Sequence, residues 1–530
     1  MADVAHELSS SSTLSTEISH ASLLRAIPLM HLLAGFGRQF KARNLAAQGF
    51  TEEEANRMYA MSREVEFIDG FVSHHWGSSR MGKFFSLLIY SNISAATIVS
   101  VIMATLATVM QLQGWLPART CNTLWCKNGM VFAPWCWLFG SVSFFLTFLS
   151  WHVVVDYVGV GKGYFFDKLC VHQYKKERQV AGILSFAAFV SRANEFIMLW
   201  DSHYFTRLWC TLEVASLVKT HSNKSHIPLT FLPVELATLS FVGWAAFTVM
   251  HGINFLNMLL DDIIPFDLLI AAFGFIAVYV FVRVLRRYAI QRKALNVQLG
   301  AFRVAEATCF LERDREIVHA TLINWFGSLD AFDEHVHTTI KEKTLATIGP
   351  ELHFPLKYIG PFFLLRFFGS MDITVAGRYT LVIPPDQSAA SHVIATISYN
   401  IMVITYWPVF LRICNLYTER LESMRKDIAL NIAMTTGCLA YAQGCIAMSF
   451  HVIQAQPIYV AIPYLLFSLV WAAWLQRGSV KGWLIPSSDS TIPSKLDEVA
   501  DTATNSESLA MKHERHDSAC KFGGREAWRS

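Results

Sequence analysis

Residues 84–112 read FFSLLIYSNISAATIVSVIMATLATVMQL, and residues 131–155 read VFAPWCWLFGSVSFFLTFLSWHVVV. Neither stretch contains a charged residue, and each exceeds the roughly 20 apolar residues with which a helix crosses a bilayer. An uncharged run of this length is typical of a membrane span and too long for an ordinary core helix. These two stretches therefore predict an α-helical, polytopic membrane protein.

Further apolar segments bring the predicted number of spans to eight: 236–256, 266–282, 353–371, 391–411, 428–453 and 458–476. Lys357 and Arg366 interrupt the segment 353–371, and a charge inside a span is costly unless it is paired or reaches the interface. The sequence of this segment alone is compatible with three structures: a span, a re-entrant element or an interfacial helix. Arg366, His251 and His451 are the candidate functional polar groups within the membrane.

The placement of Lys and Arg predicts the orientation of the spans. One set of loop ends is basic and holds Arg80, Lys83, Lys162, Lys168, Arg283, Arg286, Arg287, Arg292, Lys293, Arg412, Arg420, Arg425, Lys426, Arg477 and Lys481. The opposite loops hold only Arg119, Lys127 and Arg378, beside Asp261 and Asp262. Eight spans with both termini cytoplasmic place every basic loop in the cytoplasm, and this parity requires 353–371 to cross. The sequence shows no recognisable signal that targets the chain to a particular membrane.

Composition supports this class of protein. Of 530 residues, 53% are hydrophobic and only 16% charged, whereas soluble domains carry about 25% charged residues. The net charge of +3 is too small to indicate a nucleic-acid partner. The N-terminus lacks a basic segment followed by an apolar one, which argues against a cleaved secretory signal. Cys121 and Cys126 lie between the first two spans, where they either pair in an oxidising compartment or remain free thiols.

The chain divides by composition into alternating membrane and cytoplasmic parts. We expect a partly disordered N-terminal segment (1–58), an α/β domain (59–83 plus 156–222) split by a transmembrane hairpin (84–155), a transmembrane pair (223–286), a cytoplasmic helical segment (287–352), spans five to eight (353–476) and a disordered cytoplasmic tail (477–530). In the helical segment, Gly327 is expected to end one helix and Ser328 to cap the next.

Alternating strands and helices predict a parallel sheet in the α/β domain. Residues 67–80 read FIDGFVSHHWGSSR, an apolar strand (67–72) followed by a polar loop. Two more short strands are expected at 164–171 and 196–200, the second followed by a loop and an amphipathic helix. Ligands of open α/β sheets bind at loops of this kind, beyond the carboxyl ends of the strands.

Three motifs in this order, FVSHHW, FFDKLCVHQ and YFTRLWCTLEVASL, resemble the Toll/interleukin-1 receptor (TIR) superfamily. The resemblance is nearest to divergent TIR-like domains of large membrane proteins in algae and other protists. The segment FFDKLCVHQ is also similar to the second strand of heterokaryon-incompatibility domains. The sequence departs from the TIR pattern by the inserted hairpin 84–155 and by His172, which stands where a small polar or acidic residue is common. The resemblance is confined to residues 59–83 and 156–222.

The resemblance implies a set of site residues. In TIR domains that cleave NAD, the glutamate of the W-C-x-x-E segment is catalytic, and it maps to Glu213. The ligand-binding residues expected around it are Ser73, His74, Trp76, Gly77, Ser78, Asp167, Arg207 and Trp209. NAD is then a substrate, and no cofactor is expected. The structural alternative is that Glu213 lies on the polar edge of its helix and pairs with Arg207 or Lys219.

A metal site at His74 and His75, with His172 and His203 as partners, is less favoured, because adjacent strand residues point to opposite faces. We expect no metal.

Three functions follow from these observations. The first is a membrane-tethered signalling or protein-interaction protein, with the lipid bilayer as one partner and other proteins or self-association through the TIR-like domain as another. The second is an NAD nucleosidase that uses Glu213. The third is a channel or transporter regulated by the TIR-like domain. No nucleic-acid partner is expected.

Overall fold

The computed structural model describes residues 18, 20–41, 50–120, 131–221, 227–259, 266–309, 312–348, 356–379, 389–418, 423–455 and 458–476. The predicted disorder of the tail and of the first residues, and the pairing of Cys121 with Cys126, lie outside the described residues.

A six-stranded mixed sheet forms the centre of the α/β domain, with the strand order β2-β1-β6-β3-β7-β8. The strands are β1 (Arg25–Pro28), β2 (Arg63–Glu64), β3 (Gly70–His74), β6 (Gly163–Phe165), β7 (Phe196–Trp200) and β8 (Leu229–Pro233). Strands β6, β3, β7 and β8 are parallel, whereas β1 runs antiparallel to both of its neighbours. The expected purely parallel sheet is therefore wrong at the β1–β2 edge.

The central strand β3 pairs with strands from the far side of the inserted hairpin. Phe71 is in register with Phe165 of β6 and with Phe196 of β7, and its ring stacks on both at 4.9 and 5.4 Å between centroids. This pairing confirms that the segment before the hairpin shares one sheet with the segments after it, but the strand is Gly70–His74 and not 67–72 as predicted. Every residue of β3 and β7 is buried, which explains their apolar composition.

Several predicted boundaries in this domain are corrected by the structure. The second strand ends at Phe165, and a short helix, α6 (Asp167–Cys170), replaces its expected second half. The N-terminal segment supplies β1, and the supposed transmembrane pair 223–286 begins with β8. The limits at residues 59 and 222 are thus too narrow. The sequence pattern does not separate strand β8 from the following helix, because the apolar residues of the two are continuous.

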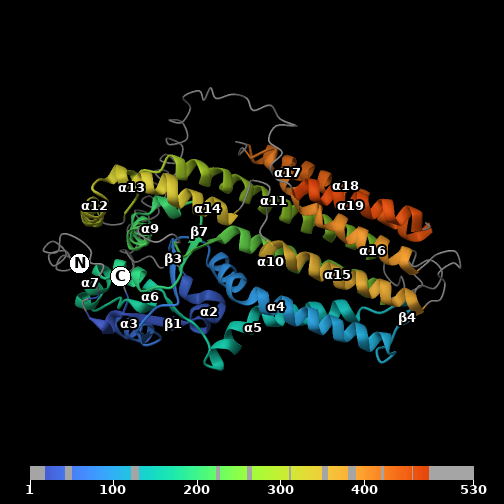
Figure 1. Cartoon of the computed structure of the whole chain (residues 1–530), viewed down its shortest axis with the longest axis horizontal. Coiled ribbons are helices and arrows are strands. Elements are labelled where there is room, and N and C mark those ends of the chain that lie inside the picture. The colour runs from blue at the N-terminus through green and yellow to red at the C-terminus, as the bar shows by residue number, and fades with distance from the viewer. Residues whose placement is uncertain are drawn as a thin grey trace, which may run out of the picture. The chain divides into compact units, whose positions relative to one another are not determined.

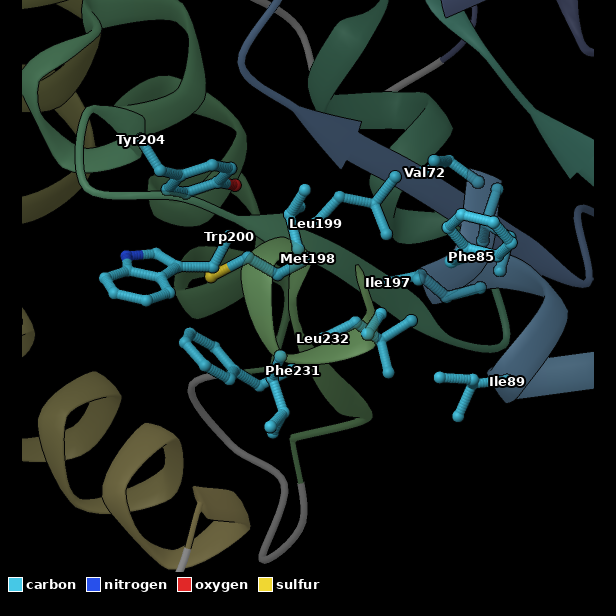
Figure 2. Packing of buried hydrophobic residues seen from close by; sticks show 14 of the residues in the cluster. Val72, Phe85, Ile89, Ile197, Met198, Leu199, Trp200, Tyr204, Phe231 and Leu232 are labelled. Atoms are coloured by element: carbon cyan, nitrogen blue, oxygen red, sulfur yellow. The ribbon is translucent and has the colours of Figure 1, made fainter. Parts of the chain in front are cut away.

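Two layers of helices cover the sheet. On one face lie α8 (Phe186–Ser191) and α9 (Leu208–Thr220), toward which Phe71 and Ser73 point. On the other face lie the first turns of α4 (Arg80–Leu112) and α10 (Val234–Leu259). Figure 2 shows Val72 and Ile197 directed toward Phe85 and Ile89 of α4. Around the β1 end are α2 (Leu29–Gly37), the single-turn η2 (Arg38–Phe40), α3 (Glu52–Tyr59) and α7 (Lys176–Leu184).

Helix α4 serves both the sheet and the membrane. Residues 82–89 are all buried, whereas beyond Ile93 only a stripe of small or polar residues is buried: Ala96, Ser100, Ala104, Ala107 and Gln111. This change is expected where a helix leaves a sheet and enters lipid. Helix α10 begins directly after β8, and the two helices approach so closely that a Cβ on Gly82 would collide with Val234.

Five described segments are long and apolar enough to cross a membrane: Arg80–Leu112, Trp135–Tyr157 (α5), Val234–Ile253, Ile394–Asn415 and Ile458–Leu475. The chain is accordingly an integral membrane protein with several spans. The fourth segment comprises α16 (Ala389–Ile404) and α17 (Tyr406–Asn415), and the fifth lies in α19 (Ile458–Gln476). Three further long helices pack among them: α11 (Phe266–Gly300), α15 (Leu356–Tyr379) and α18 (Met424–Ala455) (Figure 1).

The segment 287–352 is helical, as its pattern predicts. It contains α12 (Glu312–Phe326), α13 (Leu329–His335), the π-helical turn η5 (Val336–Ile340) and α14 (Lys341–Ile348). Gly327 has a φ of +88°, and the Ser328 hydroxyl accepts a hydrogen bond from the Ala331 amide at 3.0 Å. The predicted helix end and cap are confirmed. The boundary at residue 286 is wrong, because it falls inside α11.

Candidate functional site

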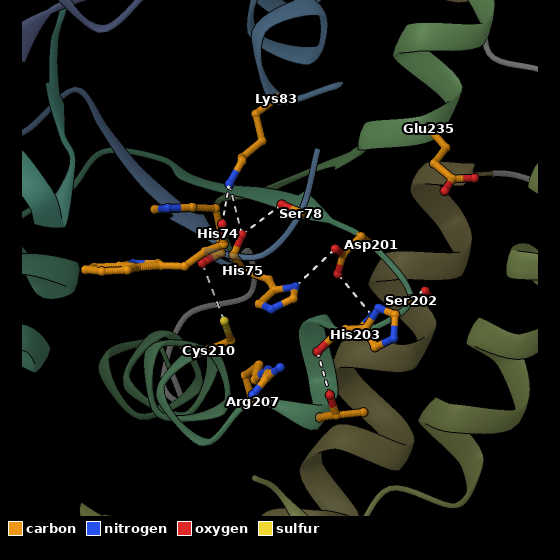
Figure 3. Close-up of polar contacts among 12 residues, drawn as sticks. His74, His75, Ser78, Lys83, Asp201, Ser202, His203, Arg207, Cys210 and Glu235 are labelled. Atoms are coloured by element: carbon orange, nitrogen blue, oxygen red, sulfur yellow. Dashed lines mark hydrogen bonds and ion pairs between the residues drawn. The ribbon is translucent and has the colours of Figure 1, made fainter. Parts of the chain in front are cut away.

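The last residue of β3 and the polar loop after it, residues 74–79, lie at the carboxyl edge of the sheet and are held by groups from α4 and α9. The ammonium of Lys83, which is fully buried, donates to the carbonyls of His75 and Trp76 at 3.0 and 3.4 Å. The thiol of Cys210 lies 3.6 Å from the His74 carbonyl. Figure 3 shows these side chains converging on the loop from α4 and α9. We call residues 74–79 the edge loop.

His75 joins the edge loop to the end of β7. Its Nδ1 lies 3.1 Å from Oδ2 of Asp201, the first residue after that strand, and both side chains are largely buried. The other oxygen of Asp201 accepts from the His203 amide at 3.0 Å. Gly77 packs against the same imidazole, since a Cβ there would lie 2.8 Å from His75 Nε2. The contact therefore fixes the loop against β7.

Trp76 joins the edge loop to α6, the short helix that follows β6. Its indole N–H donates to Asp167 at 2.7 Å, and the Lys168 amide donates to the other carboxylate oxygen at 2.6 Å. Burial raises the pKa of Asp167, against the lowering effect of these hydrogen bonds. The ammonium of Lys168 donates to the carbonyls of Gln39 and Lys41, which brings η2 over the edge. The cavity left among these groups measures about 10 Å³, room for about one water molecule.

Glu213 is 8% exposed and lies beneath the sheet edge, on the opposite face from α4. Its carboxyl group accepts a hydrogen bond from Ser73, whose hydroxyl also bonds Tyr204. Burial raises the pKa of Glu213 to about 8, although the Ser73 hydrogen bond lowers it. Burial likewise raises the pKa of Tyr204. At neutral pH this cluster is therefore uncharged, and the expected alternative pairing of Glu213 with Arg207 or Lys219 is wrong.

Arg207 and Trp209 form their hydrogen bonds with the helical segment and not with the edge loop. The Arg207 guanidinium lies 3.4 Å from the Thr308 hydroxyl, and the Trp209 indole donates to Asp314 of α12 at 3.0 Å. These contacts attach α9 to the helical segment, as does the hydrogen bond from Lys219 to the Trp325 carbonyl. The structure thus brings Ser73, His74, Trp76, Gly77, Ser78, Asp167 and Glu213 together but leaves two of the predicted ligand residues outside.

The histidines do not assemble into a metal centre. His74 is buried and stacked on Phe166, and burial lowers its pKa, so it is neutral. His172 lies elsewhere, with its Nε2 3.0 Å from the Asn56 side chain. Among the described residues no group of three His, Cys, Asp or Glu side chains has the geometry to hold a metal ion.

Sequence reasoning missed Lys83, Lys168, Asp201 and Tyr204 as members of this cluster. Asp201 carries a usable signal, because it is the polar residue that directly ends the apolar run Phe196–Trp200. In the sequence the two lysines look like ordinary basic residues of cytoplasmic loops. Their burial against backbone carbonyls has no signature in the local sequence.

No family model, no curated protein and no solved structure matches this chain.

Proposed function

We propose that this chain is a membrane-tethered signalling or protein-interaction protein whose α/β domain is TIR-like and passes changes at the edge loop to the membrane helices. The observation that carries the proposal is the direct connection of the sheet to two spans. Ser79 ends the edge loop and caps α4, with its hydroxyl accepting from the Gly82 amide at 3.2 Å. Helix α10 follows β8 without a linker.

The proposed topology has eight spans with both termini in the cytoplasm. Crossing by 353–371 is supported by the contacts of α15 with two other helices, α10 and α5. Near its start, the Tyr358 carbonyl accepts from Trp244 of α10. Fourteen residues later, a rise of about 21 Å, the Asp372 carboxylate accepts from the amides of Cys136 and Trp137 at 2.8 Å, where α5 begins. The charge asymmetry of the loops supports the proposed orientation, with both termini in the cytoplasm.

The surroundings of Glu213 favour this role over NAD cleavage. A carboxylate stabilises an oxocarbenium-like transition state only when it is ionised and can approach the ribose. Glu213 is neutral at pH 7, and its hydrogen bond to Ser73 holds it under the strand. The cavity of about 10 Å³ above the strand ends does not admit a dinucleotide. The enzyme hypothesis therefore requires a rearranged edge loop.

Hydrogen exchange of the full-length protein in lipid nanodiscs tests the proposed coupling. Asp201→Asn removes the charge that holds His75, and the exposed Asp330→Asn is its matched control. We expect amides in the first turns of α4 to exchange about tenfold faster in Asp201→Asn, as loss of about 1.4 kcal/mol implies. Unchanged exchange in α4, together with faster exchange in the edge loop, would show that the two are not coupled.

A further inference from the structure

A groove of about 750 Å³ opens among three helices of the membrane part, α4, α15 and α16. In Figure 1, α15 lies between the other two. Most of the lining is apolar, and it includes Ile93, Ile98, Leu364, Phe367, Val403 and Ile404. Ile98 and Phe367 are 60% and 41% exposed, so the groove faces the side on which lipid would lie. Its volume falls within the usual range for small-molecule sites, roughly 300–1,000 Å³.

Among the described residues that line the groove, the only charged ones are the cations Lys357 and Arg366. Arg366 is satisfied within the protein, because its guanidinium bonds the Tyr399 hydroxyl and lies over the same ring at 4.6 Å. Two cations in an apolar groove are unfavourable unless an anion or a wet interface compensates them.

Lys357 has no such partner among the described residues. Its ammonium lies 5.2 Å from the centre of the Tyr358 ring, and no hydrogen bond or ion pair joins it to another residue that the structure describes. The nearest acidic influence is Glu195, whose carboxylate already bonds Tyr90 and Thr230. Pro361, one turn later in α15, has no amide to bond the Lys357 carbonyl. One end of the groove thus presents the Lys357 ammonium beside a carbonyl that lacks its usual helical partner at Pro361.

We propose that this groove binds one anionic phospholipid from the leaflet next to the α/β domain. The phosphate pairs with the Lys357 ammonium, and a hydroxyl of the headgroup donates to the Lys357 carbonyl. An acyl chain lies along Ile98, Leu364 and Phe367. Lipid fits this surface better than a soluble anion, because the apolar walls continue for several turns beyond the single unpaired charge.

Native mass spectrometry of the full-length protein in mild detergent tests the site. We compare phosphatidylglycerol with phosphatidylcholine of the same chains, and inorganic phosphate as a separate competitor. One phosphatidylglycerol should bind with a higher affinity than phosphatidylcholine, and Lys357→Gln should weaken it about fivefold, the effect of one basic residue at a membrane surface. Phosphate should not displace it. The control Lys426→Gln removes an exposed lysine of α18 and should change nothing.

A second variant separates the groove from the charge. Thr97→Trp fills the groove from α4 without altering any charge, and it should abolish retention of phosphatidylglycerol while the melting temperature stays near that of the parent. Equal binding of the two lipids, displacement by phosphate, unchanged binding in both variants, or a dimer in place of a lipid adduct would each overturn the proposal.

Discussion

Replacement of Glu213 by glutamine probes the buried cluster beneath the sheet edge. Glutamine has nearly the same size and retains an oxygen that accepts the hydrogen bond from Ser73, but it does not ionise. The parent carboxyl group has a pKa of about 8 in the folded protein, against an ordinary value of 4.5. The variant therefore isolates the energetic effect of this single titration.

The direction in which stability changes with pH follows from the number of protons that the folded and the unfolded state bind. Between pH 4.5 and about 8 the folded protein retains a proton that the unfolded chain has released, so the free energy of unfolding falls as pH rises through this window. Below pH 4.5 Glu213 is protonated in both the folded and the unfolded state, and its contribution to stability is fully present. Above about pH 8 that contribution is lost. At about 1.4 kcal/mol for a tenfold change in proton affinity, the total is on the order of a few kcal/mol.

Thermal unfolding of the purified protein between pH 5 and 9 measures this effect. Glu213→Gln should melt close to the parent at pH 5 and several degrees above it at pH 8.5, a shift that corresponds to a few kcal/mol. Glu316→Gln, an exposed carboxyl group on α12, serves as the control and should follow the parent at every pH. A difference between Glu213→Gln and the parent that does not vary with pH would refute the buried, neutral carboxyl group.

Three further predictions concern packing and topology. Gly82→Ala should lower the melting temperature markedly, because its Cβ collides with α10, whereas Gly437→Ala, with nothing within 4 Å, should not; equal effects would contradict the close approach. Trp209→Phe removes the indole hydrogen bond to α12 and should cost about 1 kcal/mol, with faster hydrogen exchange in α12; unaltered exchange there would argue against this contact. Cysteine labels in 120–125 and 290–295 should react from opposite sides of intact vesicles, and labelling from one side would disprove the proposed orientation.

Much of the fold can be predicted from the sequence, because long apolar runs have few alternative structures. The run Phe196–Trp200 is a strand with the predicted limits, and most of the uncharged stretches 84–112 and 131–155 lies in membrane-length helices. The glycine and serine at 327 and 328 also ended and capped helices as expected, because both effects are local. Local chemistry was therefore predictable.

Long-range burial was not predictable from the same patterns. Strand β1 has only four residues and ends in proline, so it acquires its identity from pairing with β6. Glu213 looked like a surface residue on an amphipathic helix, but α12 covers the outer side of α9 and the sheet covers the inner side. Lys83 appeared as a loop cation, and only the folded edge loop supplies the carbonyls that satisfy it.

Release of nicotinamide from NAD by the purified full-length protein in nanodiscs tests the central claim most directly, because it separates a signalling module from a nucleosidase. Parent protein and Glu213→Gln are compared at pH 7, where the carboxyl group is protonated, and at pH 9, where it is ionised. Neither protein should release nicotinamide above background at either pH. Release by the parent that Glu213→Gln abolishes, while its fold is retained, would contradict the account.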